Sequence, residues 1–504
     1  MTPMPARPVA QSNHQASAPS STGTQPSAAR IGAQGILLFA GFGMAQALSF
    51  ARNALLGHAL SPRDFGIAAS ITLLLQMLEM LSDLGHDRLI VQAEDGHSDD
   101  FLATTHTILV ARGLTLAILL YALAPCAAAF FSVPDAQGAF AAIALVPLIK
   151  GLTHMDCRRA QRRLDNRPQL MVEVLPQAIA LSATLPLLEI FPGYEAVVAL
   201  SLVQALSGIA IARALAGTAY RLAYRKDVAR QLVRFGWPIL LSALPLIAVY
   251  QGDRAIVGRL AGVEALAEYS AAFMITMVPG LIAARAGHAL MLPVFAAVGR
   301  QKEPLQRSFA TMAEATSILA AVYVGVFIVA GGKLLALAFG PAYRGLDGVV
   351  GWLAAMWAMR MMQAVPGMAL MAAGETKPFL IAGLIRASVL PVVFHRAAHG
   401  ASLEEIAAIG CGGEALSLLY VALRLRRVEP GLCTILLSRA SFVIPAALAA
   451  SLTVDAIGGG ALVWTMICAS GLALAMLAAG CAVMPAMRAL ARRAIAPGDP
   501  LPQT

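Results

Sequence analysis

Charged residues are scarce in this sequence. Asp, Glu, Lys and Arg make up 13% of its 504 residues and hydrophobic residues make up 58%, with a mean hydropathy of +0.72. A soluble globular protein is nearer roughly one quarter charged, so this composition argues against a soluble domain and favours a membrane protein. The net charge of +9 would suggest a nucleic-acid partner for a soluble protein. Here the loops between apolar segments account for it, and we expect no nucleic-acid partner.

Metal and disulfide patterns are also missing from the sequence. The cysteines form no C-x-x-C pair and no Cys/His spacing typical of a metal site, and we interpret them as small apolar residues of helices. We therefore expect no disulfide, metal or cofactor. The sequence also lacks a Ser/His/Asp set, a phosphate loop and a soluble domain with paired carboxylates, so we expect no enzyme. The six cysteines are Cys126, Cys157, Cys411, Cys433, Cys468 and Cys481.

The sequence is instead rich in long apolar segments. A helix needs about 20 apolar residues to cross the hydrocarbon core, where only an internally bonded backbone is stable. About fourteen segments are long enough, which predicts an all-α, polytopic membrane protein. The segments cover 32–57, 66–85, 101–125, 137–155, 170–191, 195–216, 235–258, 268–295, 309–332, 346–373, 378–395, 403–423, 435–454 and 461–485.

The loops between these segments alternate in charge. With the N-terminus inside, the inner segments hold 23 Lys and Arg residues and the outer loops hold 4. Because Lys and Arg stay on the cytoplasmic side, we predict that both termini are cytoplasmic. Residues 1–30 then form a disordered tail, rich in Ser, Ala, Gln and Pro, and residues 491–504 form a second tail. One inner loop departs from the pattern because it is acidic, with Glu94, Asp95, Asp99 and Asp100.

The chain also contains a weak internal repeat. The segment Gly57–Gly66 follows the first predicted helix, and Gly258–Ala267 follows the seventh, so that Gly57 matches Gly258 and Phe65 matches Leu266. Six helices separate the two copies, so both halves share one orientation, as in parallel repeats. We predict two six-helix lobes, 31–225 and 226–425, followed by two additional helices within 426–490.

Several short motifs resemble one family. They lie within about 30–425, and together they resemble the bacterial polysaccharide exporters of the multidrug/oligosaccharidyl-lipid/polysaccharide (MOP) superfamily. The acidic loop near Asp99 and the pair His86-Asp87 depart from the pattern of this family. The motifs are Leu60–Gly66, Ser82–Gly85 and Val91-Gln92 in the first half, and Phe235–Pro238, Asp253–Arg259, Tyr269-Ser270, Phe339–Tyr343 and Gly374–Pro378 in the second.

The resemblance implies a fold and a function. It implies two helical lobes around a central cavity and alternating access. It also implies flipping of an undecaprenyl-diphosphate-linked oligosaccharide from the cytoplasmic to the periplasmic leaflet of the bacterial inner membrane, for lipopolysaccharide or exopolysaccharide biosynthesis. The partners would be the lipid-linked oligosaccharide, membrane lipids, and the polysaccharide polymerase and chain-length machinery.

Three other functions stay open. A lipid II flippase would also have fourteen helices and a cationic cavity. A multidrug/cation antiporter would have about twelve helices and an acidic cavity, which the mostly positive charges inside the segments disfavour. An O-antigen polymerase or ligase would show a long periplasmic loop, and no predicted outer loop exceeds about twelve residues.

Charged residues inside the apolar segments are the candidate site residues, because each costs about 2.5–3.5 kcal/mol at a helix centre unless it faces a cavity or a partner. Arg112, Arg285, Arg360 and Arg386 lie deep, whereas Arg52 and Arg254 lie near the outer ends. A guanidinium binds phosphate bidentately, which suits a diphosphate head group. Alternatively, the arginines pair with Glu79, Asp83 or Glu314.

Spacing adds further residues to the candidate site. His288 shares a helix face with Arg285, and Gln363 shares one with Arg360. We expect Val278-Pro-Gly280 and Val365-Pro-Gly367 to break these two helices beside a cavity.

Gln76, Glu79 and Asp83 share one face of the second segment. The two carboxylates would bind a proton or Na⁺, or neutralise arginines, and we favour neutralisation. The last two helices would add an apolar surface for a polyprenyl tail.

Overall fold

Helices form nearly all of the protein in the computed structural model, which describes residues 28–298, 302–375, 377–457 and 461–488. No strand occurs in these ranges. The elements are α1 (Ala28–Ala59), α2 (Pro62–Leu81), α3 (His86–Gln92), α4 (Asp99–Phe130), η1 (Pro134–Ala136), α5 (Gln137–Ala142), α6 (Leu145–Lys150), α7 (Asp156–Arg162), α8 (Arg167–Ser182), α9 (Thr184–Ile190), α10 (Glu195–Ala214), α11 (Lys226–Leu260), α12 (Val263–Val298), α13 (Lys302–Phe339), η2 (Pro341–Tyr343), α14 (Asp347–Ala372), α15 (Lys377–Ala387), α16 (Leu390–Ala398), α17 (Leu403–Leu425), α18 (Pro430–Ala440), α19 (Val443–Ile457) and α20 (Leu462–Val483).

The prediction of an all-helical, multi-pass membrane protein is confirmed. Within the described ranges, ten helical segments are long and apolar enough to cross a membrane, or eleven if the pair α8–α9, bent by 45°, counts as one. The predicted spans at α1, α5–α6 and α14 are not among them. Helices α5 and α6 have six residues each, and α14 is enclosed by α12, α13 and α17, so it need not be apolar throughout. The count of fourteen therefore stays a prediction.

Several helices begin where the local sequence supplies a cap. The Ser61 hydroxyl accepts a hydrogen bond from the backbone N–H of Asp64, and Pro62 occupies the first turn of α2. Ser98 caps α4 in the same way, and Asp99 and Asp100 follow it in the first turn. Carboxylates stabilise the positive end of a helix dipole, so the acidic loop has a structural role at the start of α4.

The acidic loop also neutralises arginines of neighbouring segments. Asp99 accepts a hydrogen bond of 2.6 Å from Arg159 of α7, and Asp100 lies 3.4 Å from Arg225, just before α11. These carboxylates therefore compensate the arginines at the same end of the molecule.

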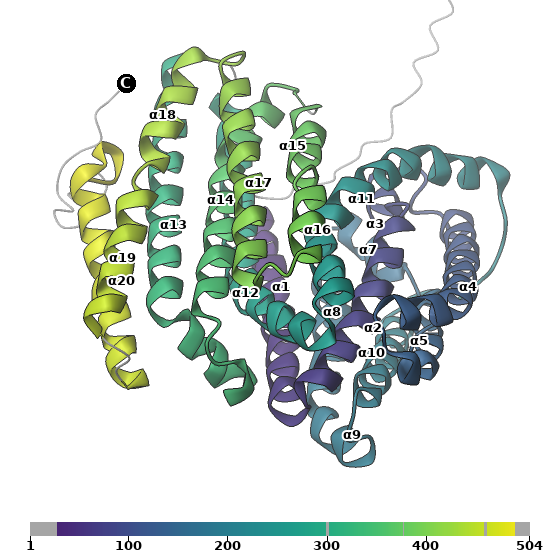
Figure 1. The fold of residues 1–504 in the computed structure, drawn as a ribbon. Helices are drawn as coiled ribbons and strands as arrows, with labels where there is room; N and C mark the ends of the chain where they lie inside the picture. The colour runs from purple at the N-terminus through teal and green to yellow at the C-terminus, as the bar shows by residue number, and fades with distance from the viewer. Residues whose placement is uncertain (1–27, 299–301, 376, 458–460, 489–504) are drawn as a thin grey trace, which may run out of the picture.

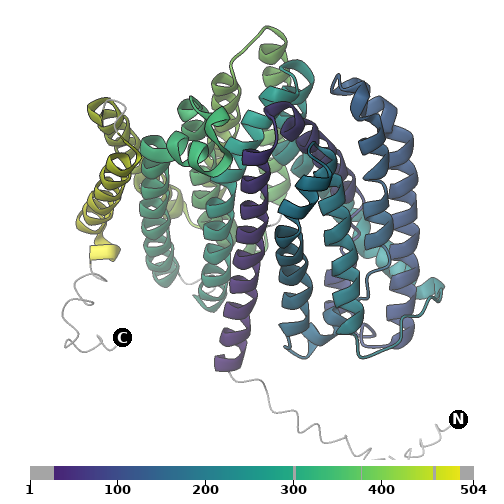
Figure 2. The same cartoon turned by 90° about the horizontal axis from the view of Figure 1, so that it is seen from below.

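The helices form two neighbouring groups with an addition at one edge (Figure 1). Helices α1–α10, in purple and blue, lie beside α12–α17, in teal and green. Helices α1 and α2 contact α12 across the junction. Helices α19 and α20, in yellow, pack against α13 at the outer edge, and the view from below shows them there as well (Figure 2).

The helix that leads into the second group, α11, begins packed against the first group. Val228 and Leu232, in the first turns of α11, share a buried cluster with Leu89 of α3 and Phe101 of α4. The beginning of α11 therefore packs with the first group although it lies beyond residue 225. The predicted lobe boundaries stay a prediction.

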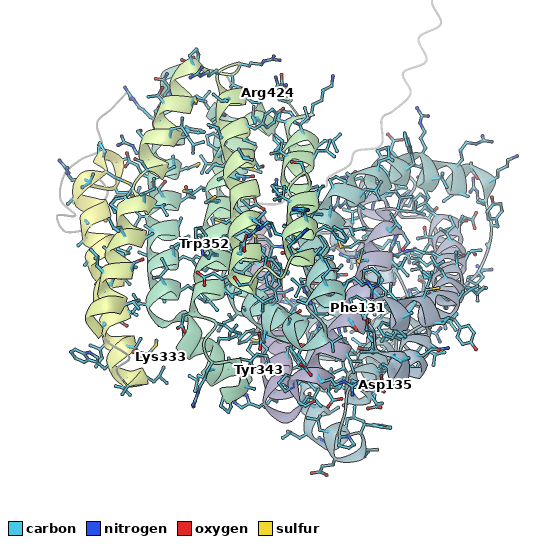
Figure 3. All side chains as sticks on the ribbon, viewed as in Figure 1. Phe131, Asp135, Lys333, Tyr343, Trp352 and Arg424 are labelled. Atoms are coloured by element: carbon cyan, nitrogen blue, oxygen red, sulfur yellow. The ribbon has the colours of Figure 1, made fainter. Side chains whose placement is uncertain are left out.

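Residues predicted on opposite sides of the membrane lie at opposite ends of the molecule. Figure 3 shows Arg424 at one end, and Asp135 and Tyr343 at the other. This sorting agrees with the predicted order of the loops. The assignment of one end to the cytoplasm stays a prediction, and the two tails lie largely outside the described residues.

The expected Pro-Gly breaks are absent from α12 and α14, and that prediction was wrong. Both helices continue through Pro279 and Pro366. A Cβ on Gly280 would stand 3.1 Å from the Trp357 ring, so this glycine allows α12 to approach α14 closely. Packing on neighbouring helices holds a long helix together where proline removes one hydrogen bond.

Candidate functional site

Arg285 is exposed and lies at the junction of the two helix groups. It comes from α12, and its guanidinium lies 3.5 Å from the ring centroid of Phe42, on α1. Glu173 of α8 and Tyr250 of α11 are close enough to interact with it electrostatically. A cation is thus placed among helices from both halves of the chain. The side chain of His288, predicted beside it, lies outside the described residues.

Arg360 and Arg386 converge on one buried carboxylate. Arg360 Nε lies 2.6 Å from Glu414 Oε1, and Arg386 Nε lies 3.6 Å from Glu414 Oε2. Glu414 is 1% exposed. The Gln363 amide donates to the main-chain oxygen of Glu414 at 3.3 Å. These contacts bring α14, α15 and α17 together around one charge cluster.

Two neighbouring aromatic rings lie against Arg360. Its guanidinium carbon lies 4.7 Å from the ring centroids of both Tyr250 and Trp357. Tyr250 also interacts electrostatically with Arg285. Tyr250 is therefore close to both the exposed Arg285 and the buried Arg360.

Glu414 was not among the predicted partners of these arginines. The predicted partners were Glu79, Asp83 and Glu314, and Glu314 lies 3.2 Å from Arg439 of α18. The signal was present, because Glu414 is an acidic residue inside the apolar segment 403–423. Such a residue requires a partner or a cavity as much as an arginine does.

Arg254 lies in a buried polar network that connects the two halves. Its guanidinium donates to Ser270 Oγ at 3.1 Å and to Gln251 Oε1 at 3.1 Å. Gln251 in turn donates to Gln76 of α2 at 3.1 Å. Arg52 lies elsewhere, and donates to Gln204 of α10 at 2.6 Å.

Glu79, Asp83 and Arg112 lie in yet another place, near the end of α2. Glu79 Oε1 lies 2.8 Å from Lys150 Nζ, and Asp83 accepts from the backbone N–H of Gly85 at 2.9 Å. Arg112 donates to Ser82 Oγ and to the main-chain oxygen of Glu79, each at 3.0 Å. The cation facing the Glu79 carboxylate is thus a lysine rather than the predicted arginine.

The predicted site residues consequently do not form one cluster. Arg285 lies at the junction, and Arg360, Gln363 and Arg386 surround Glu414. Arg254 belongs to the network around Gln251, and Arg52 contacts Gln204. Arg112, Glu79 and Asp83 lie at the end of α2. Helix spacing predicted which residues share a face, but not which helix that face meets.

An apolar groove runs between the C-terminal helices and the rest of the chain. Its two parts have volumes of about 460 and 610 Å³ and lie between α13, α14 and α17 on one side and α18 and α19 on the other. Val324, Trp352, Ala355 and Ala447 line both parts. In the described residues, no three His, Cys, Asp or Glu side chains are placed to hold a metal ion.

Comparison with known proteins identifies the family of the chain. A family of polysaccharide biosynthesis proteins matches residues 55–346. The chain belongs to this family. No curated protein sequence matches the chain.

Solved structures share the fold of this member of the polysaccharide biosynthesis family. The lipid II flippase MurJ in an inward closed conformation superimposes with a TM-score of 0.67 at 11% identity, over 87% of this chain and 97% of MurJ. A multidrug resistance MATE transporter of the MOP superfamily matches in its inward-facing conformation with a TM-score of 0.56 at 15% identity, over 79% of this chain and 96% of the transporter. At these identities the likeness shows the fold.

The family match and the shared fold confirm the resemblance to MOP-type polysaccharide exporters. The matched proteins are transporters and flippases rather than enzymes. The fold does not decide the substrate, because a lipid II flippase and a multidrug transporter share it. Only the side chains of the site can separate them.

Proposed function

We propose that this protein is a flippase that moves an undecaprenyl-diphosphate-linked oligosaccharide from the cytoplasmic to the periplasmic leaflet by alternating access. It would act in the bacterial inner membrane with both termini in the cytoplasm. The membership in a polysaccharide biosynthesis family supports the pathway. The observation that carries the mechanism is the exposed Arg285 between helices of both halves.

Arg285 suits the diphosphate of such a lipid. A guanidinium offers two parallel N–H donors that match the oxygens of a phosphate, and its charge persists at all physiological pH values. The direct partner of Arg285 is the neutral Phe42 ring, and the Glu173 carboxylate acts on the guanidinium electrostatically without forming an ion pair among the described residues. A diphosphate bound here would contact α12 and lie beside α1.

The apolar groove suits the polyprenyl tail. Its walls are formed almost entirely by apolar side chains of α13, α14, α17, α18 and α19. Lipid is as apolar as the groove, so moving a long isoprenoid chain from lipid into the groove is favourable only where the groove matches the shape of the chain. The groove would therefore guide the tail while the head group crosses.

The positive charge at the junction argues against a cation antiporter. A cationic drug would be repelled by Arg285, and Glu414 is occupied by two arginines. A lipid II flippase stays a second candidate, because lipid II carries the same diphosphate and the same type of tail.

Reconstitution would test this proposal. Purified protein in proteoliposomes should move a fluorescent undecaprenyl-diphosphate oligosaccharide to the opposite leaflet, and should leave lipid II and ethidium in place. Movement of lipid II without movement of the oligosaccharide lipid would favour the second candidate. Movement of ethidium alone would favour a cation antiporter.

A further inference from the structure

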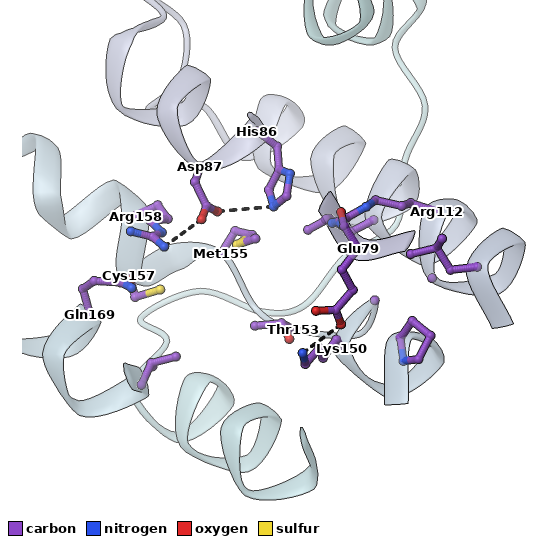
Figure 4. Close-up of a pocket in the computed structure, with 16 residues that line it drawn as sticks. Glu79, His86, Asp87, Arg112, Lys150, Thr153, Met155, Cys157, Arg158 and Gln169 are labelled. Carbon is purple, nitrogen blue, oxygen red and sulfur yellow. Dashed lines mark hydrogen bonds and ion pairs between the residues drawn. The ribbon is translucent and has the colours of Figure 1, made fainter. Parts of the chain in front are cut away.

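A separate polar pocket lies inside the first helix group. It has a volume of about 260 Å³ and is lined by α2, α3, α4, α6, α7 and α8 (Figure 4). Lys150 lies at its open side, since its side chain is 47% exposed. Gln169, Met155 and Cys157 are buried and form its inner wall. We call it the α2–α8 pocket.

The charges of the α2–α8 pocket do not cancel. Glu79 pairs with Lys150 at 2.8 Å, and Asp87 pairs with Arg158 at 2.7 Å, so both carboxylates have a cation (Figure 4). The guanidinium of Arg112 donates only to two neutral oxygens, Ser82 Oγ and the main-chain oxygen of Glu79.

A guanidinium has five N–H donors, and these two bonds leave further donors for a ligand. Among the described residues, no carboxylate forms an ion pair with Arg112. The residues that line the pocket therefore include three cations and two carboxylates, with Asp83 beside His86 just outside the lining, and a bound anion would find Arg112 without an ion pair.

A buried acceptor marks the inner wall of the pocket. Gln169 is 3% exposed and lines the cavity. Its amide nitrogen donates to Glu173 Oε1 at 2.5 Å, whereas its Oε1 has no hydrogen-bond partner within the described part of the chain. A buried acceptor without a donor is destabilising. A ligand hydroxyl that donates to this oxygen would remove that cost.

We propose that the α2–α8 pocket binds a single anionic sugar, with its carboxylate or phosphate on Arg112 and one hydroxyl donating to Gln169. Leu109, Leu116 and Met155 supply apolar surface for the C–H groups of the ring. The pocket is smaller than the roughly 300–1,000 Å³ of sites for drug-sized ligands, so it admits one sugar unit. This inference rests on the proposed function in one respect, since the sugar would be a unit of the transported head group.

Calorimetry would test the pocket without any transport. Full-length protein in phosphatidylcholine nanodiscs is titrated with glucuronate, glucose 1-phosphate, glucose or inorganic phosphate. Glucuronate and glucose 1-phosphate should bind. Glucose and inorganic phosphate should bind at least about tenfold more weakly, because each lacks one of the two recognition elements.

Variants locate the site of binding. Arg112→Gln should weaken glucuronate binding at least about tenfold. Arg344→Gln, an equal charge change on an exposed outer-loop residue, should leave it unchanged. Arg112→Lys keeps the positive charge but lacks the paired N–H donors of a guanidinium, so it should bind glucuronate with intermediate affinity. This second variant maintains the test if Arg112→Gln fails to fold.

Three results would overturn the proposal: no binding of either anionic sugar, equal binding by wild type and Arg112→Gln, or displacement of glucuronate by phosphatidylglycerol in the nanodisc. The last result would assign the pocket to a lipid phosphate. The outcome is distinguishable from failure of the proposed function. If the protein flips lipid but binds no free sugar, only the sugar-binding proposal is rejected. If it binds the sugar but moves no lipid, only the flippase proposal is rejected.

Discussion

Gly57 lies directly against the ring of Phe339. A Cβ on Gly57 would stand 2.6 Å from Phe339 Cδ1, and Phe339 is fully buried. The same contact occurs a second time with the halves exchanged, because a Cβ on Gly258 would stand 2.8 Å from Phe131 Cε1. The two glycines match in the repeat. The two rings also have similar places, because Phe131 directly follows α4 and Phe339 ends α13, and these are the third long helices of the two halves. Reciprocal contacts of this kind join the halves at the end that we predict to be periplasmic.

Substituting Ala at Gly57 should destabilise this contact between the halves. The added methyl group would overlap the buried Phe339 ring and crowd the Phe339 backbone, at a cost of about 1–3 kcal/mol. The apparent melting temperature in detergent should fall, as measured by size-exclusion chromatography after heating. Gly412→Ala is the matched control, since no atom lies within 4 Å of the position of its Cβ. Equal melting temperatures for both variants would contradict the tight contact.

Removing Glu414 should reduce the amount of folded protein. Glu414→Ala leaves Arg360 and Arg386 without their carboxylate in a buried place, and such a loss costs about 3–5 kcal/mol. Membrane abundance and the melting temperature should both fall. Arg360→Met combined with Glu414→Ala should recover part of the stability, because one buried charge is removed with its partner. A Glu414→Ala variant as stable as the wild type would show that the ion pair does not stabilise the protein.

Replacing Arg285 should affect export rather than stability. Arg285 is exposed and its direct contact is one aromatic ring, so Arg285→Ala should accumulate normally. Polysaccharide export should fall at least about tenfold, since charge-assisted bonds to the diphosphate are lost. Arg285→Lys should restore little of it, because the planar fork is missing. Normal export by Arg285→Ala at normal abundance would reject the head-group role.

The connection between the two helix groups is held by a neutral histidine. In the turn after α6, His154 Nε2 lies 3.0 Å from the Thr218 carbonyl oxygen and donates to it, and His154 Nδ1 accepts from the Asp156 backbone N–H at 3.2 Å. Burial lowers the pKa of His154 below its usual 6.5, and Asp156, Arg159 and Arg213 lie close enough to influence it. Protonation would place two donors face to face at Nδ1.

Acidic pH should therefore loosen the segment 216–225. Because the folded-state pKa lies below the unfolded value, the contribution of the neutral ring is complete above about pH 6.5 and is lost as the pH falls toward the folded-state pKa. Hydrogen exchange in this segment, corrected for the intrinsic rate, should be faster at pH 5 than at pH 7.5. His154→Ala, which removes both ring nitrogens, should exchange fast at both values. A pH-independent rate in the wild type would contradict this role.

The sequence by itself determined the class of the protein. Long apolar segments must become helices in a membrane, since no other open structure satisfies the backbone there. The charge bias along the loops predicted an order of loops that agrees with the two ends of the molecule. The match between Gly57 and Gly258 was visible in the sequence, although the rings that they contact were not.

Only the tertiary structure decided which charged residues meet. Arg360 and Arg112 looked equivalent as deep cations, yet Arg360 is buried against Glu414 and Arg112 lines an open pocket. The difference depends on which helices pack together. Glu414 is 54 positions from Arg360, so the local spacing of residues could not predict the pair. The continuous course of α12 and α14 through their prolines has the same origin, since neighbouring helices hold each of them in place.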